Sequence, residues 1–321
     1  MSPNEAMYEG FANALPAELR SMALALPSSL GLLPSANLPF DHVFSHEVTH
    51  GAPELLLEVL PEVSPERVRI ATLSHTLAVV ETLGRSRVSA GRVQESKTVL
   101  AVLDELRAAR ARLSEQILPG AACELERADR SVREAIREER ALLRRIEAAS
   151  FEDYRRITLG KQAVRASAAL LLAQASGASE RTVEQIRRAL RGVWLGLEFE
   201  DDAGDWEEDF RYGGGAWAVS LARRRLELGE PPPSADQRPT EPNLVRSRVF
   251  RTGVLHSMLR AARQQYRSAY RHARLLGAER LASWADQRVQ RLDDILPLER
   301  RFAGYTVRAR RLAPWAVHVL T

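Results

Sequence analysis

Apolar residues along most of this chain recur three or four positions apart, which is the spacing of one face of an α-helix. Between Ser96 and Leu118 they alternate with charged residues and predict an amphipathic helix that ends at Pro119-Gly120. The apolar positions of that helix are Val99, Leu100, Leu103, Leu106 and Leu113. From Val68 to Thr82 the pattern is apolar nearly all round, which predicts a helix buried on every side.

The rest of the chain also divides into helical segments separated by glycine and proline. The expected helices cover residues 41–50, 54–60, 122–149, 152–175, a segment capped by Ser179, a segment from 216 to 228, and 244–276, 278–295 and 297–312. No segment keeps a period of two, which a half-buried strand would show. We therefore expect an all-α fold in which residues 1–321 form a single helical bundle.

Two proline-rich stretches interrupt this pattern. Residues 1–40 carry prolines at positions 3, 16, 27, 34 and 39, so we expect an irregular N-terminal segment with short helices at most. Residues 229–243 combine several prolines with polar residues, and we expect a flexible loop there.

The helix that begins after Ser179 ends in a dense acidic stretch. Its apolar stripe consists of Ile186, Leu190, Val193, Trp194 and Leu197. One further turn of that stripe brings Asp201, Asp205 and Glu208 onto nearly the same bearing, with Asp202 and Asp209 close to one side. The acids therefore occupy a face that elsewhere points into the core. Since unpaired buried charges are costly, and magnesium-like cations take carboxylate oxygens, this face predicts a divalent cation site.

Composition narrows the choice of partner. Charged residues make up 27% of the chain, both signs are interleaved, and the formal net charge is +4, so no strong nucleic-acid signature is present and we expect no nucleic-acid partner. Of the 46 basic residues two are lysines, Lys97 and Lys161. A lysine that persists against such an arginine bias is informative, because its compact charge suits phosphate.

The cysteine count and the apolar runs indicate a compartment. Cys123 is the single cysteine, so no disulfide framework exists. The N-terminus does not resemble a signal peptide, and no apolar run approaches the roughly 18–20 residues of a membrane span. We expect a soluble, cytoplasmic protein.

The acidic stretch and the helix before it resemble motifs of a known family. Asp201-Asp202-x-x-Asp205, followed by Glu208-Asp209, is similar to the second aspartate-rich motif of the class I isoprenoid synthases, in the form found in the trans-prenyltransferase branch. Tyr154-x-x-Ile157-x-x-x-Lys161-Gln162-Ala163 resembles the lysine motif of the same family. The resemblance covers about residues 38–276.

This resemblance implies a fold, a substrate class and a cofactor. The fold would be an isoprenoid-synthase-like helical bundle around a central cavity, and the substrate a linear prenyl diphosphate. Asp201, Asp202 and Asp205 would be catalytic and bind Mg²⁺, with Glu208 and Asp209 as further metal ligands, and Lys161 would contact the diphosphate. The family resemblance also favours a homodimer, and a partner synthase subunit is the alternative.

The first aspartate-rich motif of the family is degenerate in this chain. The family has two carboxylate clusters on facing helices, and where the first should lie the sequence reads Glu81-Thr82-Leu83-Gly84-Arg85. Glu81 is then the one metal-binding carboxylate expected there. Arg85, Arg87 and Arg92 follow and would bind the diphosphate.

Three functions remain open on the sequence. The first is a class I terpenoid synthase that ionises a prenyl diphosphate, with cyclisation favoured over chain elongation because the first aspartate pair is missing. The second is a non-catalytic partner or diphosphate-binding protein of the same fold. The third is a zinc hydrolase, because His46-Glu47-Val-Thr-His50 matches the pattern of two histidines one turn apart with a glutamate base.

Overall fold

The computed structural model describes residues 3–30, 47–89, 93–143, 149–211, 216–227 and 242–312. This part of the chain contains helices and turns and no strand, which confirms the expected all-α class. The helices are α1 (Pro3–Asn13), α2 (Ala17–Ser29), α3 (Glu47–Gly51), the 3-10 helix η2 (Glu54–Val59), α4 (Pro65–Ser89), α5 (Lys97–Ile117), α6 (Ala122–Leu143), α7 (Phe151–Lys161), α8 (Ser167–Ala175), α9 (Glu180–Gly204), α10 (Trp206–Arg211), α11 (Trp217–Glu227), α12 (Pro242–Thr252), α13 (Val254–Leu276) and α14 (Glu279–Leu312).

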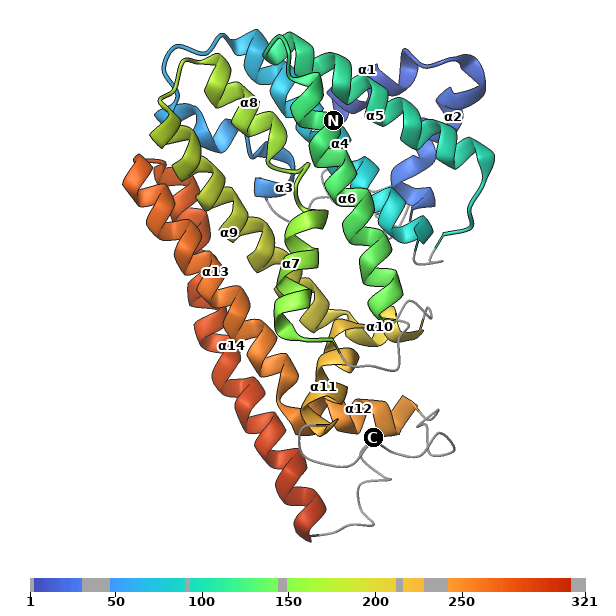
Figure 1. Ribbon diagram of the computed structural model, residues 1–321, viewed down its shortest axis with the longest axis vertical. Helices are drawn as coiled ribbons and strands as arrows, with labels where there is room; N and C mark the ends of the chain where they lie inside the picture. Colours follow the sequence, from blue (N-terminus) through green and yellow to red (C-terminus); the bar gives the residue numbers. More distant parts are fainter. Residues whose placement is uncertain are drawn as a thin grey trace.

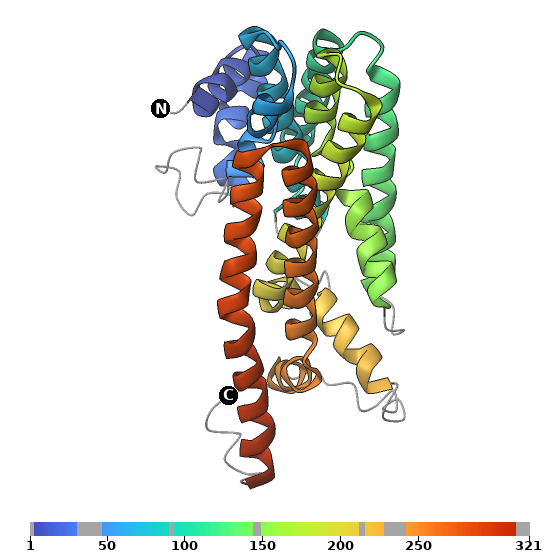
Figure 2. The same cartoon turned by 90° about the vertical axis from the view of Figure 1, so that its left-hand side faces the viewer.

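Most of the long helices run along the long axis of the molecule. Helices α13 and α14 form an antiparallel pair along one side, and α9 packs against α13 on the inner side of that pair (Figure 1). Helices α1 and α2 pack against α4 and α5 at one end, while α10, α11 and α12 lie toward the opposite end (Figures 1 and 2).

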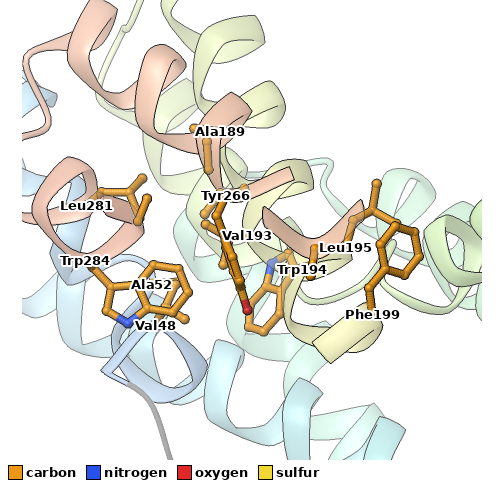
Figure 3. Packing of buried hydrophobic residues seen from close by; sticks show 14 of the residues in the cluster. Val48, Ala52, Ala189, Val193, Trp194, Leu195, Phe199, Tyr266, Leu281 and Trp284 are labelled. Atoms are coloured by element: carbon orange, nitrogen blue, oxygen red, sulfur yellow. The ribbon is translucent and has the colours of Figure 1, made fainter. Parts of the chain in front are cut away.

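The central contact of the fold joins α9 to α13. It is close because α9 presents glycines to α13: a Cβ placed on Gly196 would lie 2.5 Å from a ring carbon of Tyr266. The rings of Tyr266 and Trp284 meet edge to face with centroids 5.7 Å apart, and Figure 3 shows the packing around them and Trp194. This core fixes the orientation of α9, whose C-terminal end carries the acidic stretch.

Two predicted helix starts are confirmed by their caps. The hydroxyl of Ser96 accepts a hydrogen bond from the backbone N–H of Val99, and that of Ser179 accepts one from Thr182. Each satisfies one of the N–H groups that a helix start leaves without a partner inside the helix.

The helix predicted over 152–175 is divided into α7 and α8. Between them, residues 162–166 form turns. Their hydrogen bonds join residues three apart, such as the 3.1 Å bond from Arg165 N–H to the Gln162 carbonyl. The apolar periodicity continues through this segment, so it did not reveal the break.

Two other predicted helix boundaries are wrong, one at a glycine and one at a proline. The helix expected over 244–276 is broken into α12 and α13 at Gly253, whose φ of 62° is in the left-handed region that glycine tolerates. Conversely, the two helices expected on either side of residue 296 form one helix, α14, with Pro297 inside it. Pro297 and Asp293 are exposed, so the carbonyl that loses its helical partner there lies on a solvent-facing side.

The N-terminal segment is more regular than expected. Residues 3–30 form α1 and α2, because Pro3 begins α1 and Pro16 precedes α2, positions where a missing N–H costs little. The expected loop at 229–243 falls mostly on residues 228–241, which lie outside the described residues, as do the predicted helical residues 41–46 and 144–148.

Candidate functional site

The C-terminal ends of α4, α6 and α9 enclose a pocket with a volume of about 180 Å³, which we call the acidic pocket. Six carboxylates and four cationic side chains line it, so its formal charge is negative. The carboxylates are Glu139, Glu198, Asp201, Asp202, Asp205 and Asp209, and the cations are Arg87, Arg140, Lys161 and Arg165.

Three of these carboxylates form a tight group. One carboxylate oxygen each from Asp202, Asp205 and Asp209 lies within 4.8 Å of the other two, and no other such group of three potential ligands occurs in the described residues. The group forms because α9 ends at Gly204 with Asp205 as its C-cap, and α10 begins at Trp206, which brings Asp209 back beside the end of α9. Three hard oxygen donors at this separation fit a magnesium ion.

The other two acids of the motif are placed differently. Asp201 lines the acidic pocket but does not belong to the group of three. Glu208 is exposed and does not line the pocket. The structure thus brings four of the five acids predicted in this stretch to one pocket.

The pocket disfavours the charged form of Asp202, one of the three grouped carboxylates. Burial raises the pKa of Asp202 well above its usual value, and the neighbouring charge of Glu198 adds to this effect. The hydroxyl of the buried Tyr154 donates a 2.5 Å hydrogen bond to Asp202 Oδ2, which fixes that side chain. A bound cation would oppose this shift, because a nearby positive charge favours the charged form of a carboxylate.

Lys161 reaches the acidic pocket as predicted, but it is already paired. Its Nζ lies 2.9 Å from Glu139 Oε1 and 2.6 Å from Glu198 Oε1. Burial alone would lower the pKa of Lys161, but the charges of the two glutamates hold it well above its usual value. Gln162 and Trp217 complete the arrangement, donating 2.7 Å hydrogen bonds to Glu198 and Glu139 respectively.

The α4 side of the pocket carries no carboxylate among its described residues. Thr82, Leu83 and Ser86 line the pocket, together with Arg87, whose Nη1 also donates a 3.0 Å hydrogen bond to the Leu30 carbonyl. This is the helix on which the first aspartate-rich motif was expected. Its pocket-facing positions therefore offer hydroxyls and an apolar side chain.

Glu81 and Arg85, both predicted as site residues, do not line the pocket. Glu81 is buried and pairs with Arg85 Nε at 2.7 Å and with the fully buried Arg110 at 3.3 Å. Arg85 pairs in addition with Asp104 of α5 at 2.6 Å, and Arg110 pairs with Asp129 of α6. Glu81 thus belongs to an ion network that joins α4, α5 and α6. Arg92, the third predicted arginine, lies outside the described residues.

Several residues of the pocket were missed by the sequence prediction. Glu139 and Arg140 come from α6, whose proximity to α9 no sequence pattern indicated. Arg165 comes from the turn between α7 and α8 and lies 5.4 Å from the centre of the Trp194 ring. Glu198 had a usable signal, because it precedes Asp202 by four residues and therefore lies on the same helix face.

The predicted zinc motif is mostly outside the described residues. His46 and the side chains of Glu47 and His50 are not described, while Val48 between them is fully buried. None of the described helices is long and apolar enough to cross a membrane.

Comparison with known proteins identifies the fold. No family model matches the sequence, and no curated protein matches it significantly. Two solved structures match the structure with probability 1.00. Geranylgeranyl pyrophosphate synthase from Corynebacterium glutamicum is 17% identical, with a TM-score of 0.66 over 90% of each chain. Polyprenyl synthetase from Streptomyces coelicolor is 16% identical, with a TM-score of 0.65 over 89% of this chain and 96% of the other. The chain therefore has the all-helical isoprenoid synthase fold, as the resemblance of its acidic motif predicted.

Proposed function

We propose that this protein acts on a linear prenyl diphosphate, in the manner of a class I isoprenoid synthase, and that the diphosphate binds in the acidic pocket. The observation that carries the proposal is the group formed by Asp202, Asp205 and Asp209 at the mouth of a pocket in this fold. Both structural neighbours are named as synthases of prenyl diphosphates or polyprenyl compounds, which supports the substrate class.

In this proposal the three aspartates hold Mg²⁺, which supplies positive charge to the diphosphate oxygens when bound. Arg87 and Arg140 line the same pocket and can donate hydrogen bonds to the diphosphate. The bond that breaks joins the first carbon of the prenyl chain to the diphosphate oxygen, and the electron pair leaves with the diphosphate. Leu83, Ile136 and Trp217 give apolar surface against which the chain can lie.

The size of the pocket favours a reaction of one substrate. Its volume of about 180 Å³ is small beside the roughly 300–1,000 Å³ of ordinary ligand pockets. Chain elongation requires space for a second diphosphate, whereas cyclisation or hydrolysis after ionisation does not. We therefore favour cyclisation, and a short prenyl chain over a long one.

A second candidate is a non-catalytic protein that binds a prenyl diphosphate or a partner synthase. Two observations favour it: the α4 side of the pocket lacks carboxylates, and Lys161 is engaged by Glu139 and Glu198. Without carboxylates on α4 the pocket can hold fewer Mg²⁺ ions, and a lysine paired with two glutamates offers less charge to the substrate. Both features therefore reduce the positive charge available to a departing diphosphate.

The test is incubation of the purified protein with geranyl, farnesyl or geranylgeranyl diphosphate, with and without isopentenyl diphosphate, in Mg²⁺ or in chelator. Diphosphate release and organic products are followed together. We expect Mg²⁺-dependent release and product from a single short substrate. Product that requires isopentenyl diphosphate would overturn cyclisation in favour of elongation. Binding of the substrates without release would establish the second candidate.

A further inference from the structure

A second groove, separate from the acidic pocket, is lined by arginines. It lies between the start of α7, helix α11 and the outer side of α13, and has a volume of about 660 Å³. We call it the arginine groove. Its cationic residues are Arg225, Arg260, Arg263, Arg267 and Arg271, and no carboxylate is among its described lining residues.

Three of the arginines form a row on one face of α13. Arg260, Arg267 and Arg271 are separated by seven and four residues, which places them within about 20° of a common bearing at 100° per residue. With a rise of 1.5 Å per residue, the row is about 16 Å long. All three side chains are exposed. A row of this length is too long for one phosphate group and offers places for several.

The arginines at the edges of the groove are held by neighbouring groups. Arg225 donates 2.6 Å hydrogen bonds to the Thr252 carbonyl and to Ser257 Oγ. Arg263 pairs with Asp293 of α14, which lies 3.9 Å from Arg267 as well. Asp293 can neutralise one charge of the five.

The remaining positive charge has few partners within the described part of the chain, where neither Arg260 nor Arg271 forms an ion pair. The neighbouring His256 reports the resulting field. Its pKa is lowered, by burial first and then by the charges of Arg260, Arg300 and Arg225.

We propose that the arginine groove is a binding site for a soluble anion that carries several phosphate groups. Guanidinium groups match phosphate because their planar fork donates two parallel hydrogen bonds. A concave groove with a row of such forks suits a small polyphosphate better than a flat membrane surface. The site is chemically distinct from the acidic pocket, where six carboxylates outnumber four cationic side chains.

The test measures the affinity for sodium tripolyphosphate by isothermal titration calorimetry. EDTA is present throughout, so that any metal-dependent binding at the acidic pocket is removed. The groove variant carries Arg260→Gln, Arg267→Gln and Arg271→Gln. The matched control carries Arg127→Gln, Arg130→Gln and Arg137→Gln, three exposed arginines of α6 outside the groove. Both variants lose three positive charges from helix surfaces, and thermal unfolding verifies that each is folded.

We expect the native protein to bind one tripolyphosphate per chain. The groove variant should bind at least tenfold more weakly, and the α6 control should differ from the native protein less than twofold. No saturable binding, or equal weakening in both variants, would overturn the proposal. Binding to phosphatidylglycerol vesicles with no binding of tripolyphosphate would overturn it too, because the occupant would then be a membrane surface.

Discussion

The two sides of the acidic pocket carry opposite chemistry. The α9–α10 side presents the grouped oxygens of Asp202, Asp205 and Asp209, whereas the α4 side presents Thr82 and Ser86 with Arg87 beside them. The isoprenoid synthases that the sequence resembles have carboxylates on both facing helices. In this chain the carboxylate group lies on one side of the pocket, and hydroxyl and guanidinium groups lie on the other.

The difference arises from helix geometry. Glu81 and Arg85 are four residues apart and share one face of α4, which turns toward α5 and the buried Arg110. Thr82 and Ser86 are also four apart, but their face is rotated by about 100° and turns toward the pocket. A shift of one residue thus decides whether a side chain of α4 lines the acidic pocket or joins the ion network with Arg110.

The largest effect is expected from removal of the acidic side. Asp205→Asn together with Asp209→Asn should reduce Mg²⁺-dependent diphosphate release about a thousandfold, because several kcal/mol of charge stabilisation is lost. Glu208→Gln, an exposed acid outside the pocket, is the control and should retain activity within about threefold. Steady-state rates with geranyl diphosphate measure both. Equal activity in the double variant and the control would contradict the assignment of the metal ligands.

The next effect concerns the stability of the pocket. Lys161→Met leaves Glu139 and Glu198 without their shared cation, and breaking a buried pair in this way costs about 3 kcal/mol. Chemical denaturation at pH 7 measures the loss in the free energy of unfolding. Lys97→Met, the exposed lysine at the start of α5, should change it by less than about 0.5 kcal/mol.

The same variant has a defined pH dependence. Burial raises the pKa of Glu198, but the charges of Lys161 and Arg165 outweigh burial and leave the pKa lowered in the native protein. The stability that this carboxylate contributes is therefore fully present above the usual glutamate pKa of about 4.3 and is lost as the pH falls through the lowered native value. The difference between the native protein and Lys161→Met should shrink as the pH is lowered from 7 to values below about 4.3. An unchanged difference would show that the pair does not set the pKa of Glu198.

A carboxylate added to the α4 side tests whether that side faces the proposed metal site. Ser86→Asp adds a seventh carboxylate to the pocket and should tighten Mg²⁺ binding about fivefold, as expected for one added negative charge at moderate distance in a partly solvated pocket. Ser283→Asp on the exposed surface of α14 carries the same change of charge and should leave Mg²⁺ affinity unaltered. Titration calorimetry compares the two. A weaker Mg²⁺ affinity in Ser86→Asp would show that this residue does not face the metal.

The smallest effect is expected from removal of the ion pair that joins α10 to α12. Arg246 of α12 makes a bidentate pair with Glu207, with both distances 2.7 Å, and α10 carries Asp209. The pair is partly exposed, so Arg246→Gln should cost less than about 1 kcal/mol in stability. It should weaken Mg²⁺ binding about threefold because Asp209 is held less firmly. Lost stability with unaltered Mg²⁺ affinity would confine the pair to a structural role.

Sequence reasoning succeeded where one helix carried the whole signal. The apolar stripe of α9 continues into Asp201, Asp202 and Asp205, and Ser179 marks the helix start, so both the helix and its acidic end followed from one periodicity. Asp209 was also predicted by extending the same helix, and it joins the group although α9 ends before it and α10 carries it.

The site residues could not be predicted from the sequence where they depend on which face of a helix packs against its neighbours. Helix α4 is apolar nearly all round, so no stripe indicated that Thr82 and Ser86, and not Glu81, would face the pocket. Glu139 enters the site through the packing of α6, which the sequence does not encode locally. The turns between α7 and α8 likewise bring Arg165 into the pocket without any glycine or proline to mark them.

The most direct test of the proposed metal site on the α9–α10 side is to count bound ions, with Mn²⁺ as a paramagnetic substitute for Mg²⁺. Electron paramagnetic resonance titration measures free Mn²⁺ in the native protein and in the Asp205→Asn, Asp209→Asn variant. We predict one tightly bound ion per native chain, lost in the variant and retained in the Glu208→Gln control. No tight binding in the native protein, or equal binding in the variant, would contradict a metal site formed by Asp202, Asp205 and Asp209.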